Sequence, residues 1–436
     1  MTKKTIINFL LNKLNTKELI NIKHLIISYI FRYLISLLIN ILLIRRLGEE
    51  NFGLFSYVNS ISGIFGIIST FGLQTVIVTK LLNSSFEDKS KILSNGFILS
   101  LTTGIIAGLL QIIFILFKNG DENEIIILTF INILIYFFDT FKILTFYYES
   151  EVNSKQVTKI SNITLIICTL YRLIILFGNY SLYHIAFSYV LDYIISAILL
   201  YKVIPKNIFN LLDLKYEFYI IKKLFFDSLP YLFSGLFISF FMKIDLVVIK
   251  NILSNKDAGI FASSVRLTEI WYFIPGMIQS SFFPSLYEKK ISSNSYDKTI
   301  IKLYKVLIYF SLFIIFINIF FGKFLITYLF GVSYLPGYSS LVIHIWSLLF
   351  VSISVIRNSY LFAHNLSKIF FYIHVIGAIL NLILCYFLIS MFGMIGASIA
   401  TLFSYFVVSY LCNFFFKSLR NESQNIHKAF FTLLKI

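Results

Sequence analysis

Ten ionisable side chains of this 436-residue chain lie inside apolar stretches that are long enough to cross a membrane. Six are cationic and four are anionic: Arg32, Asp139, Lys142, Arg172, Asp192, Lys243, Asp245, Arg266, Glu269 and Arg357. A charge at the bilayer centre costs about 3 kcal/mol, so such residues usually face a bundle interior or a watery cavity, where they pair or contact a ligand. The cationic excess predicts a cavity for an anionic molecule.

The elements that must position these charges are membrane-spanning helices. The chain is 58% hydrophobic and only 13% charged, against roughly 25% charged residues in a soluble domain. Apolar runs of about 18 to 25 residues predict membrane helices, and they are too long for barrel strands. The composition therefore predicts an all-α polytopic membrane protein. We expect twelve spans, at 24–44, 53–78, 92–117, 125–147, 160–177, 183–204, 224–249, 258–286, 303–321, 341–362, 370–391 and 394–416.

The distribution of basic residues predicts the orientation. With the N-terminus in the cytoplasm, the inner segments carry 24 Lys and Arg residues and the outer loops carry 6. Cytoplasmic loops are enriched in Lys and Arg, so this bias places both termini inside. The net charge of +16 would also fit a nucleic-acid partner, but the lysines cluster in short loops, so we expect none. We expect no cleaved signal peptide, because the Lys-rich first residues lack a small-residue cleavage site.

Two loops have matching sequences 206 residues apart. The first is LGEENFGLFSYVNSI at 47–61, and the second is LSNKDAGIFASSVRL at 253–267. Gly53 matches Gly259, and Phe55 matches Phe261. Each loop follows the first span of a set of six, so the two halves enter the membrane from the same side. This predicts two parallel six-helix lobes related by a pseudo-two-fold axis along the membrane normal.

The repeat and the charge runs divide the chain into five parts. An amphipathic segment that lies on the cytoplasmic surface is expected at 1–23, because apolar residues recur there at helical spacing. The lobes are expected at 24–204 and 224–416, joined by a cytoplasmic linker at 205–223. A cytoplasmic tail is expected at 417–436. Rocking one lobe against the other would expose a central cavity to each side in turn.

Several stretches resemble a known family of membrane proteins. They lie at 45–73, 243–288, 329–350 and 377–405. The Asp before the second repeat loop (Asp245), the turn at 259–263, the following Arg266 and the Phe-Pro pair at 283–284 match the pattern of O-antigen-type lipid-linked oligosaccharide flippases of the MOP exporter superfamily. Ser263 stands where Ala is common. The resemblance implies a MOP/MATE-like fold in a bacterial inner membrane.

The resemblance also implies the function. Such proteins move polyprenyl-diphosphate-linked oligosaccharides to the outer leaflet for O-antigen or capsule synthesis. A diphosphate is anionic, and Arg suits it because its fork binds two oxygens and stays charged. The partners implied are the lipid-linked glycan, the bilayer, and a polysaccharide polymerase with its chain-length regulator. Family members usually act as monomers.

Arg32 and Arg266 are the candidates for binding the diphosphate or glycan. Arg32 lies in the middle of its span and has no acid within one helical turn. Arg266 and Glu269 are three residues apart and can pair on one helix face, which leaves a structural role open for both.

Four other charges have alternative interpretations. Asp139 and Lys142 have the same spacing, so an internal pair is favoured over cavity contact. Asp192 is expected to be the partner of one of the arginines. Lys243 and Asp245 are two residues apart, so they are expected to point to nearly opposite faces of the helix. Lys243 can reach toward the outer surface, which leaves Asp245 facing inward as a candidate for H⁺ or Na⁺ coupling.

Arg172 and Arg357 lie near span ends, so headgroup contact is expected for both. The histidines and cysteines show no metal-ligand spacing, and no phosphate-binding Gly loop is present. We therefore expect no metal and no cofactor beyond a coupling ion.

Two alternative functions remain open. One keeps the fold and changes the cargo to a drug or metabolite exchanged for a cation, which would favour an acid-rich cavity. The other is a glycan polymerase or ligase, an enzyme class that commonly needs a large outer loop. No outer loop here exceeds about 20 residues by the span lengths expected of membrane helices.

Overall fold

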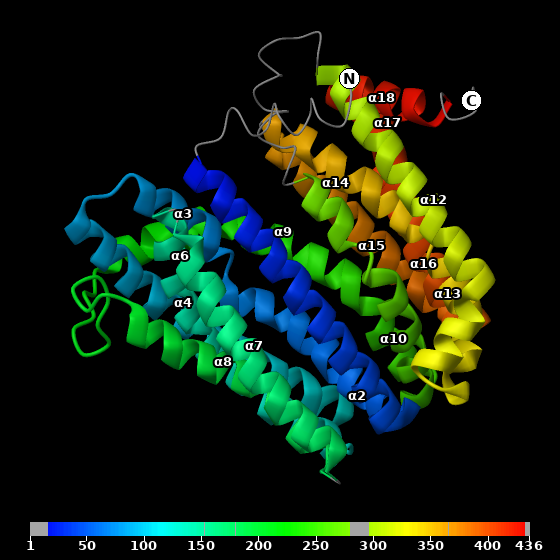
Figure 1. Cartoon of the computed structure of the whole chain (residues 1–436), viewed down its shortest axis with the longest axis horizontal. Coiled ribbons are helices and arrows are strands. Elements are labelled where there is room, and N and C mark those ends of the chain that lie inside the picture. Colours follow the sequence, from blue (N-terminus) through cyan, green and yellow to red (C-terminus); the bar gives the residue numbers. More distant parts are fainter. Residues whose placement is uncertain (1–15, 152, 179, 280–295, 365, 432–436) are drawn as a thin grey trace. The chain divides into compact units, whose positions relative to one another are not determined.

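The computed structural model describes residues 16–151, 153–178, 180–279, 296–364 and 366–431. Every regular element within these ranges is a helix, as Figure 1 shows. Long apolar runs fold as helices in a membrane because a helix satisfies its own backbone hydrogen bonds. The predicted all-α polytopic membrane protein is confirmed. The amphipathic segment expected at 1–23 lies outside the described residues as far as residue 15.

The chain divides into two compact units, which interrupt each other along the sequence. The first unit contains the chain up to Arg46 together with Phe65–Leu232, and the second contains Leu47–Ile64 and Phe233–Ile436. The division after Leu232 falls inside a helix that contains Pro230, whereas the sequence places the join in the loop 205–223. The lobe limits derived from the sequence stay a prediction.

In its described residues, the first unit contains six complete helices and parts of two others. These elements are the two ends of α2 (Thr16–Thr70), then α3 (Leu73–Leu82), α4 (Phe86–Asn119), α5 (Asn123–Asp139), the 3₁₀ turn η1 (Thr140–Lys142), α6 (Ile143–Ser150), α7 (Ser154–Phe177), α8 (Leu182–Val203) and the start of α9 (Phe218–Ile252). Helix α4 packs on α5, α5 on α8, and α8 on α7. The last two helices lie side by side in Figure 1.

The second unit contains the rest of α9 and the elements that follow. They are α10 (Asn255–Glu269), α12 (Tyr296–Leu329), η2 (Val332–Gly337), α13 (Tyr338–His344), α14 (Ser347–Ala363), α15 (Ser367–Phe392), α16 (Met394–Phe406), the π-helical turn η3 (Val407–Leu411), α17 (Cys412–Phe415), η4 (Lys417–Leu419) and α18 (Arg420–Phe431). Helices α15 and α16 pack together, as do α12 and α14. Apolar residues of α12, α14 and α18 share one core.

The described residues contain fewer separate membrane-spanning helices than the twelve expected from the sequence. Among the described residues, nine helices are long and apolar enough to cross a membrane, or ten if Val332–His344 and Ser347–Phe362 form one bent span. Phe31–Leu82 counts as one of these, although Gly48 interrupts it with φ 71° and ψ 173°. The expected span 258–286 runs past residue 279 into the part that is not described. The count of twelve therefore stays a prediction.

The two repeat loops break their helices at equivalent positions. Gly48 is the non-helical residue within α2. Ser254, 206 residues later, is the N-cap of α10, and its hydroxyl accepts a hydrogen bond from the Asp257 N–H at 3.0 Å. An N-cap hydroxyl satisfies one of the free N–H groups of the first turn. The sequence repeat thus corresponds to a repeated helix start.

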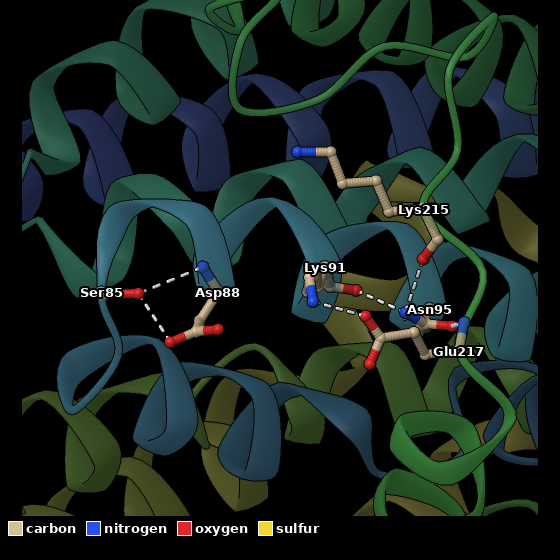
Figure 2. A network of polar contacts seen from close by, with 6 residues as sticks. All are labelled: Ser85, Asp88, Lys91, Asn95, Lys215 and Glu217. Atoms are coloured by element: carbon tan, nitrogen blue, oxygen red, sulfur yellow. Dashed lines mark hydrogen bonds and ion pairs between the residues drawn. The ribbon is translucent and has the colours of Figure 1, made fainter.

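The loop that follows α8 is tied to α4 by one amide side chain. Asn95 is fully buried, and its Nδ2 donates to the carbonyl of Lys215 at 2.8 Å, while its Oδ1 accepts from the Glu217 N–H at 2.8 Å. Lys91 pairs with the Glu217 carboxylate at 2.6 Å. Figure 2 shows this network, in which one side chain binds the backbone on both sides of Tyr216.

The segment expected as a surface tail packs into the second unit. Helix α18 contacts α12, and Leu419, Ile426 and Ala429 are fully buried in the shared core. Glu422 on the same face is also fully buried, and it accepts a hydrogen bond from the Tyr304 hydroxyl. The described part of the predicted tail is therefore a packed structural element.

Candidate functional site

A cavity of about 660 Å³ lies within the first unit. Its walls come from α2, α5, η1, α6, α7 and α8, and hydroxyl and aromatic side chains contribute much of the lining. The ionisable residues that line it, apart from tyrosines, are Arg32, Asp139, Lys142, Glu149, Arg172 and Asp192. Pockets of this size, about 300–1,000 Å³, enclose a drug-sized molecule. Five sequence-predicted residues thus meet in one cavity.

Arg172 and Asp192 form a direct ion pair on one wall of the cavity. Arg172 is 8% exposed and also donates to the Ser188 hydroxyl at 3.3 Å and the Ser188 carbonyl at 3.2 Å. Its guanidinium lies 4.1 Å from the centre of the Tyr189 ring. The expected headgroup contact of Arg172 is wrong, because its partner lies on the neighbouring helix α8. The expectation that Asp192 pairs with an arginine matches this contact.

The fourth expected span is interrupted in the middle, beside the cavity. Helix α5 ends at Asp139, a 3₁₀ turn covers Thr140–Lys142, and α6 begins at Ile143. Asp139 and Lys142 act on each other electrostatically. The expected internal pair is wrong as a direct contact, because neither side chain forms an ion pair or a hydrogen bond with any residue that the structure describes. Interrupted helices in transporters commonly mark a binding site, because irregular backbone is tolerated where it lines a cavity.

The charges of the cavity are balanced. Arg32, Lys142 and Arg172 face three acids. Arg32 is half-buried and lies on the same face of α2 as Ser36 and Asn40, which also line the cavity. Among the described residues that line this cavity, the cationic excess of the sequence is therefore absent.

Residues that sequence reasoning missed complete the lining. Glu149 lies seven residues after Lys142, which is two helical turns on the same face, and it accepts hydrogen bonds from Gln74 Nε2 at 3.1 and 3.4 Å. Tyr189 and Tyr193 flank Asp192 on the cavity face of α8. Helical periodicity, applied outward from the charged residues, would have found all three.

A second, smaller pocket lies within the second unit. Its volume is about 60 Å³, and its lining includes Lys243, Asp245, Arg266 and Glu269. A water molecule occupies about 30 Å³ in the liquid, so this pocket has room for an ion or a few waters and is too small for a sugar. Asp245 is 5% exposed, and the charges of Glu269 and Lys243 both act on it.

The four charges of this pocket differ in their contacts. Arg266 and Glu269 pair at 3.6 Å, as their spacing predicts. The expectation that Lys243 and Asp245 would face different sides is wrong, since both line the same pocket. The long Lys side chain can curve around its helix, which makes spacing a weak guide to its position.

Arg357 is also placed differently from its prediction. It is fully buried in the second unit, where it donates to the carbonyl of Val408 and to Asn358 Oδ1 at 3.0 Å. Val408 lies in the π-helical turn η3, whose altered hydrogen bonding leaves a carbonyl that the guanidinium can bind. The expected headgroup contact is wrong, and this arginine stabilises an irregular helix.

Comparison with known proteins indicates a family. A model described as "Polysaccharide biosynthesis protein" matches residues 19–289, which is more than half of the chain. A curated relative, the capsular polysaccharide biosynthesis protein CapF of Staphylococcus aureus, is 24% identical over 408 residues, covering 91% of this chain and 98% of the relative.

Solved structures indicate the fold. A multidrug resistance MATE family transporter of the MOP superfamily in an inward-facing conformation matches with a TM-score of 0.74 and 14% identity, over 90% of this chain and 96% of that chain. The lipid II flippase MurJ matches with a TM-score of 0.65 and 17% identity, over 94% and 92% of the two chains. The chain has the fold of these transporters.

Proposed function

We propose that this chain, which belongs to the polysaccharide biosynthesis protein family, moves polyprenyl-diphosphate-linked oligosaccharides across a bacterial cytoplasmic membrane. The movement is from the cytoplasmic to the outer leaflet, by alternating access. The observation that carries the proposal is the cavity of the first unit, where Arg32 and Lys142 line a space with polar and apolar walls among membrane-spanning helices. The family match supports a glycan cargo over a drug or metabolite.

Arg32 and Lys142 are the residues proposed to bind the diphosphate. A guanidinium binds two phosphate oxygens at once, and an ammonium adds a point charge. The Lys142 ammonium has no direct ion pair with a described residue, so it can bind an anion without first breaking one. Arg172 is excluded from this role, because Asp192 already neutralises it. The isoprenoid tail stays in the lipid, where its apolar surface costs nothing to keep.

The small pocket of the second unit is proposed to couple transport to H⁺ or Na⁺. Two carboxylates, Asp245 and Glu269, line a space of about 60 Å³, which suits a cation rather than a sugar. Arg266 is 48% exposed at its side chain, and its ion pair with Glu269 can exchange for contact with substrate phosphate. Its role as a glycan or diphosphate ligand remains part of the proposal.

The basic inner loops support an orientation with both termini in the cytoplasm. We propose that the protein works as a monomer beside a polysaccharide polymerase and its chain-length regulator. Cysteine labelling from each side of intact cells, at the tail and at Lys118, tests the orientation.

The proposed function is tested in proteoliposomes that contain a fluorescent short-chain polyprenyl diphosphate carrying an oligosaccharide. The wild-type protein should make the probe accessible to the opposite leaflet. Arg32→Ala and Lys142→Ala should each slow this transfer at least about tenfold, the effect of losing one charge-assisted contact of about 1.4 kcal/mol. Lys118→Ala, at an exposed position outside the cavity, is the matched control. Transfer at the wild-type rate in the folded Arg32→Ala, Lys142→Ala double variant would exclude the proposed diphosphate site.

A further inference from the structure

Binding of a diphosphate does not explain the acidic side chains that line the first-unit cavity. Asp192 is neutralised by Arg172, which leaves Asp139 and Glu149 as the other two carboxylates on the wall. An anionic substrate alone would be repelled by them. Asp139 lies in the interior of a membrane span, where a charge is costly, whereas Glu149 is exposed next to the last residue of the same span. A second chemical feature of the ligand would account for both acids on the cavity wall.

Asp139 lacks a donor within the part of the chain that the structure describes. It is half-buried, and no described side chain or backbone group donates a hydrogen bond to it. A carboxylate withdrawn from water is costly unless it accepts hydrogen bonds. A ligand in the cavity that offers hydroxyl, amide or ammonium groups would satisfy it.

Glu149 has accepting capacity on the same side of the cavity. Gln74 Nε2 approaches both of its carboxylate oxygens, and a carboxylate offers about four lone-pair sites. Glu149 lies roughly 10 Å along the helix from Lys142, at 1.5 Å per residue. Lys142 lies between Asp139 and Glu149 along the chain, so a sugar attached to a diphosphate at Lys142 would extend toward one of these acids. The hydroxyls of Thr145 and Ser161 line the same cavity.

We propose that this cavity binds the sugar next to the diphosphate and selects one that is neutral or carries an amine, while it excludes a sugar carboxylate. The inference rests on the proposed function, because it assigns the cations and the acids of the cavity to two parts of one substrate. Arg32 and Lys142 bind the diphosphate, and the acids accept hydrogen bonds from the sugar. Like charges brought together in a binding site reject the wrong ligand.

Three synthetic probes test the selectivity. They share one short polyprenyl diphosphate and differ only in the attached sugar, which is N-acetylglucosamine, glucosamine or glucuronic acid. At pH 7 in proteoliposomes, the wild-type protein should transfer the first two at least tenfold faster than the glucuronic acid probe. Equal rates for all three probes would overturn the inference and leave the flippase function standing. Failure to move any of them would overturn both.

A charge-removing variant separates recognition from folding. Asp139→Asn combined with Glu149→Gln keeps the shape of both side chains and should raise the relative rate of the glucuronic acid probe about tenfold, while it slows the glucosamine probe. Asp121→Asn, at an exposed loop position outside the cavity, should leave the ratio unchanged. An unchanged ratio in the double variant, with normal transfer of the N-acetylglucosamine probe, would show that these acids do not select the sugar.

Discussion

Gly53 and Gly259 contact each other reciprocally within the second unit. A Cβ added at Gly53 would lie 1.8 Å from the carbonyl oxygen of Asn255, and a Cβ added at Gly259 would lie 1.8 Å from that of Glu49. Both glycines, and both carbonyls, are separated by 206 residues. Such reciprocity is what a local two-fold axis between the two helix starts produces, so the contact agrees with the sequence repeat. No other residue type fits at this crossing.

Alanine at either glycine should disrupt the crossing. The added methyl group would overlap a backbone carbonyl, which cannot rotate away as a side chain can, and overpacking of this kind costs about 1–3 kcal/mol or more. We expect Gly53→Ala and Gly259→Ala to lower the melting temperature of the purified protein in detergent. Gly276→Ala is the control, because nothing lies within 4 Å of its added Cβ. Equal melting temperatures for all three variants would contradict the close approach.

The ion pair of Arg172 and Asp192 should be strongly coupled. Removing one partner of a buried pair leaves an uncompensated charge and costs about 3–5 kcal/mol, whereas replacing both by apolar residues can be nearly neutral. Arg172→Met alone should therefore destabilise the protein more than Arg172→Met combined with Asp192→Leu. Thermal unfolding measures the difference.

The control for this experiment is an exposed pair. Lys89 binds Glu151 at the surface of the first unit, and exposed pairs contribute about 0–1 kcal/mol. Lys89→Met should therefore change the melting temperature little. If the double variant at positions 172 and 192 melts as low as Arg172→Met, the pair is not what the single substitution disrupts.

Substitution of Asn95 should release the loop before α9. Asn95→Ala removes two hydrogen bonds to the loop backbone, each of which contributes about 0.5–1.5 kcal/mol. The two bonds together contribute about 1–3 kcal/mol, and about 1.4 kcal/mol corresponds to a tenfold change in an equilibrium. Trypsin should therefore cleave at Lys206 and Lys215 at least about fivefold faster. Lys91→Met, which removes only the exposed ion pair with Glu217, should have a much smaller effect. Unchanged cleavage of Asn95→Ala would show that other contacts order the loop.

Protonation of Glu422 should control the stability of α18. Burial raises the pKa of this carboxyl from 4.5 to about 7, opposed by the hydrogen bond from Tyr304. The folded state therefore binds the proton more tightly than the unfolded state, so stability is greatest below pH 4.5 and falls as the pH rises toward 7. The groups that face Glu422 are Tyr304 and Asp297 of α12, Arg357 and Tyr360 of α14, and Asn425 of α18 itself.

The pH dependence is measured as a difference between two proteins. The melting temperature of Glu422→Gln should exceed that of the wild type at pH 8 and approach it at pH 5. The difference isolates this residue from other titrating groups. Glu124→Gln, at an exposed position, should track the wild type throughout. A wild-type protein that is more stable than Glu422→Gln at pH 8 would contradict the sign of the shift.

The sequence predicted what depends on local spacing. Long apolar runs required helices, and the three-residue separation of Arg266 and Glu269 predicted their contact, because neighbours on one helix face are fixed by the helical period. The matching loops also predicted a repeat, and the helices break at equivalent positions within them. The fold class followed from these patterns.

Contacts between helices could not be predicted from the spacing of residues along the sequence. Arg172 and Arg357 lie near the ends of apolar runs, and sequence position alone placed them at the membrane surface. In the structure, Arg172 meets an acid on α8, and Arg357 binds the backbone of an irregular turn. The charge balance of the cavity likewise depends on which faces of α6 and α8 turn inward, which only the packed structure shows.

The amide of Asn95 has a practical consequence for the loop that it binds. Asn95 binds the loop backbone at Lys215 and Glu217. The segment before Lys215 can therefore change in length without disturbing these hydrogen bonds. Leu212 is 94% exposed, and doubling a flexible loop costs only about 0.6 kcal/mol. An epitope or a small folded domain inserted at Leu212 should therefore leave both units intact and provide a handle for imaging or purification.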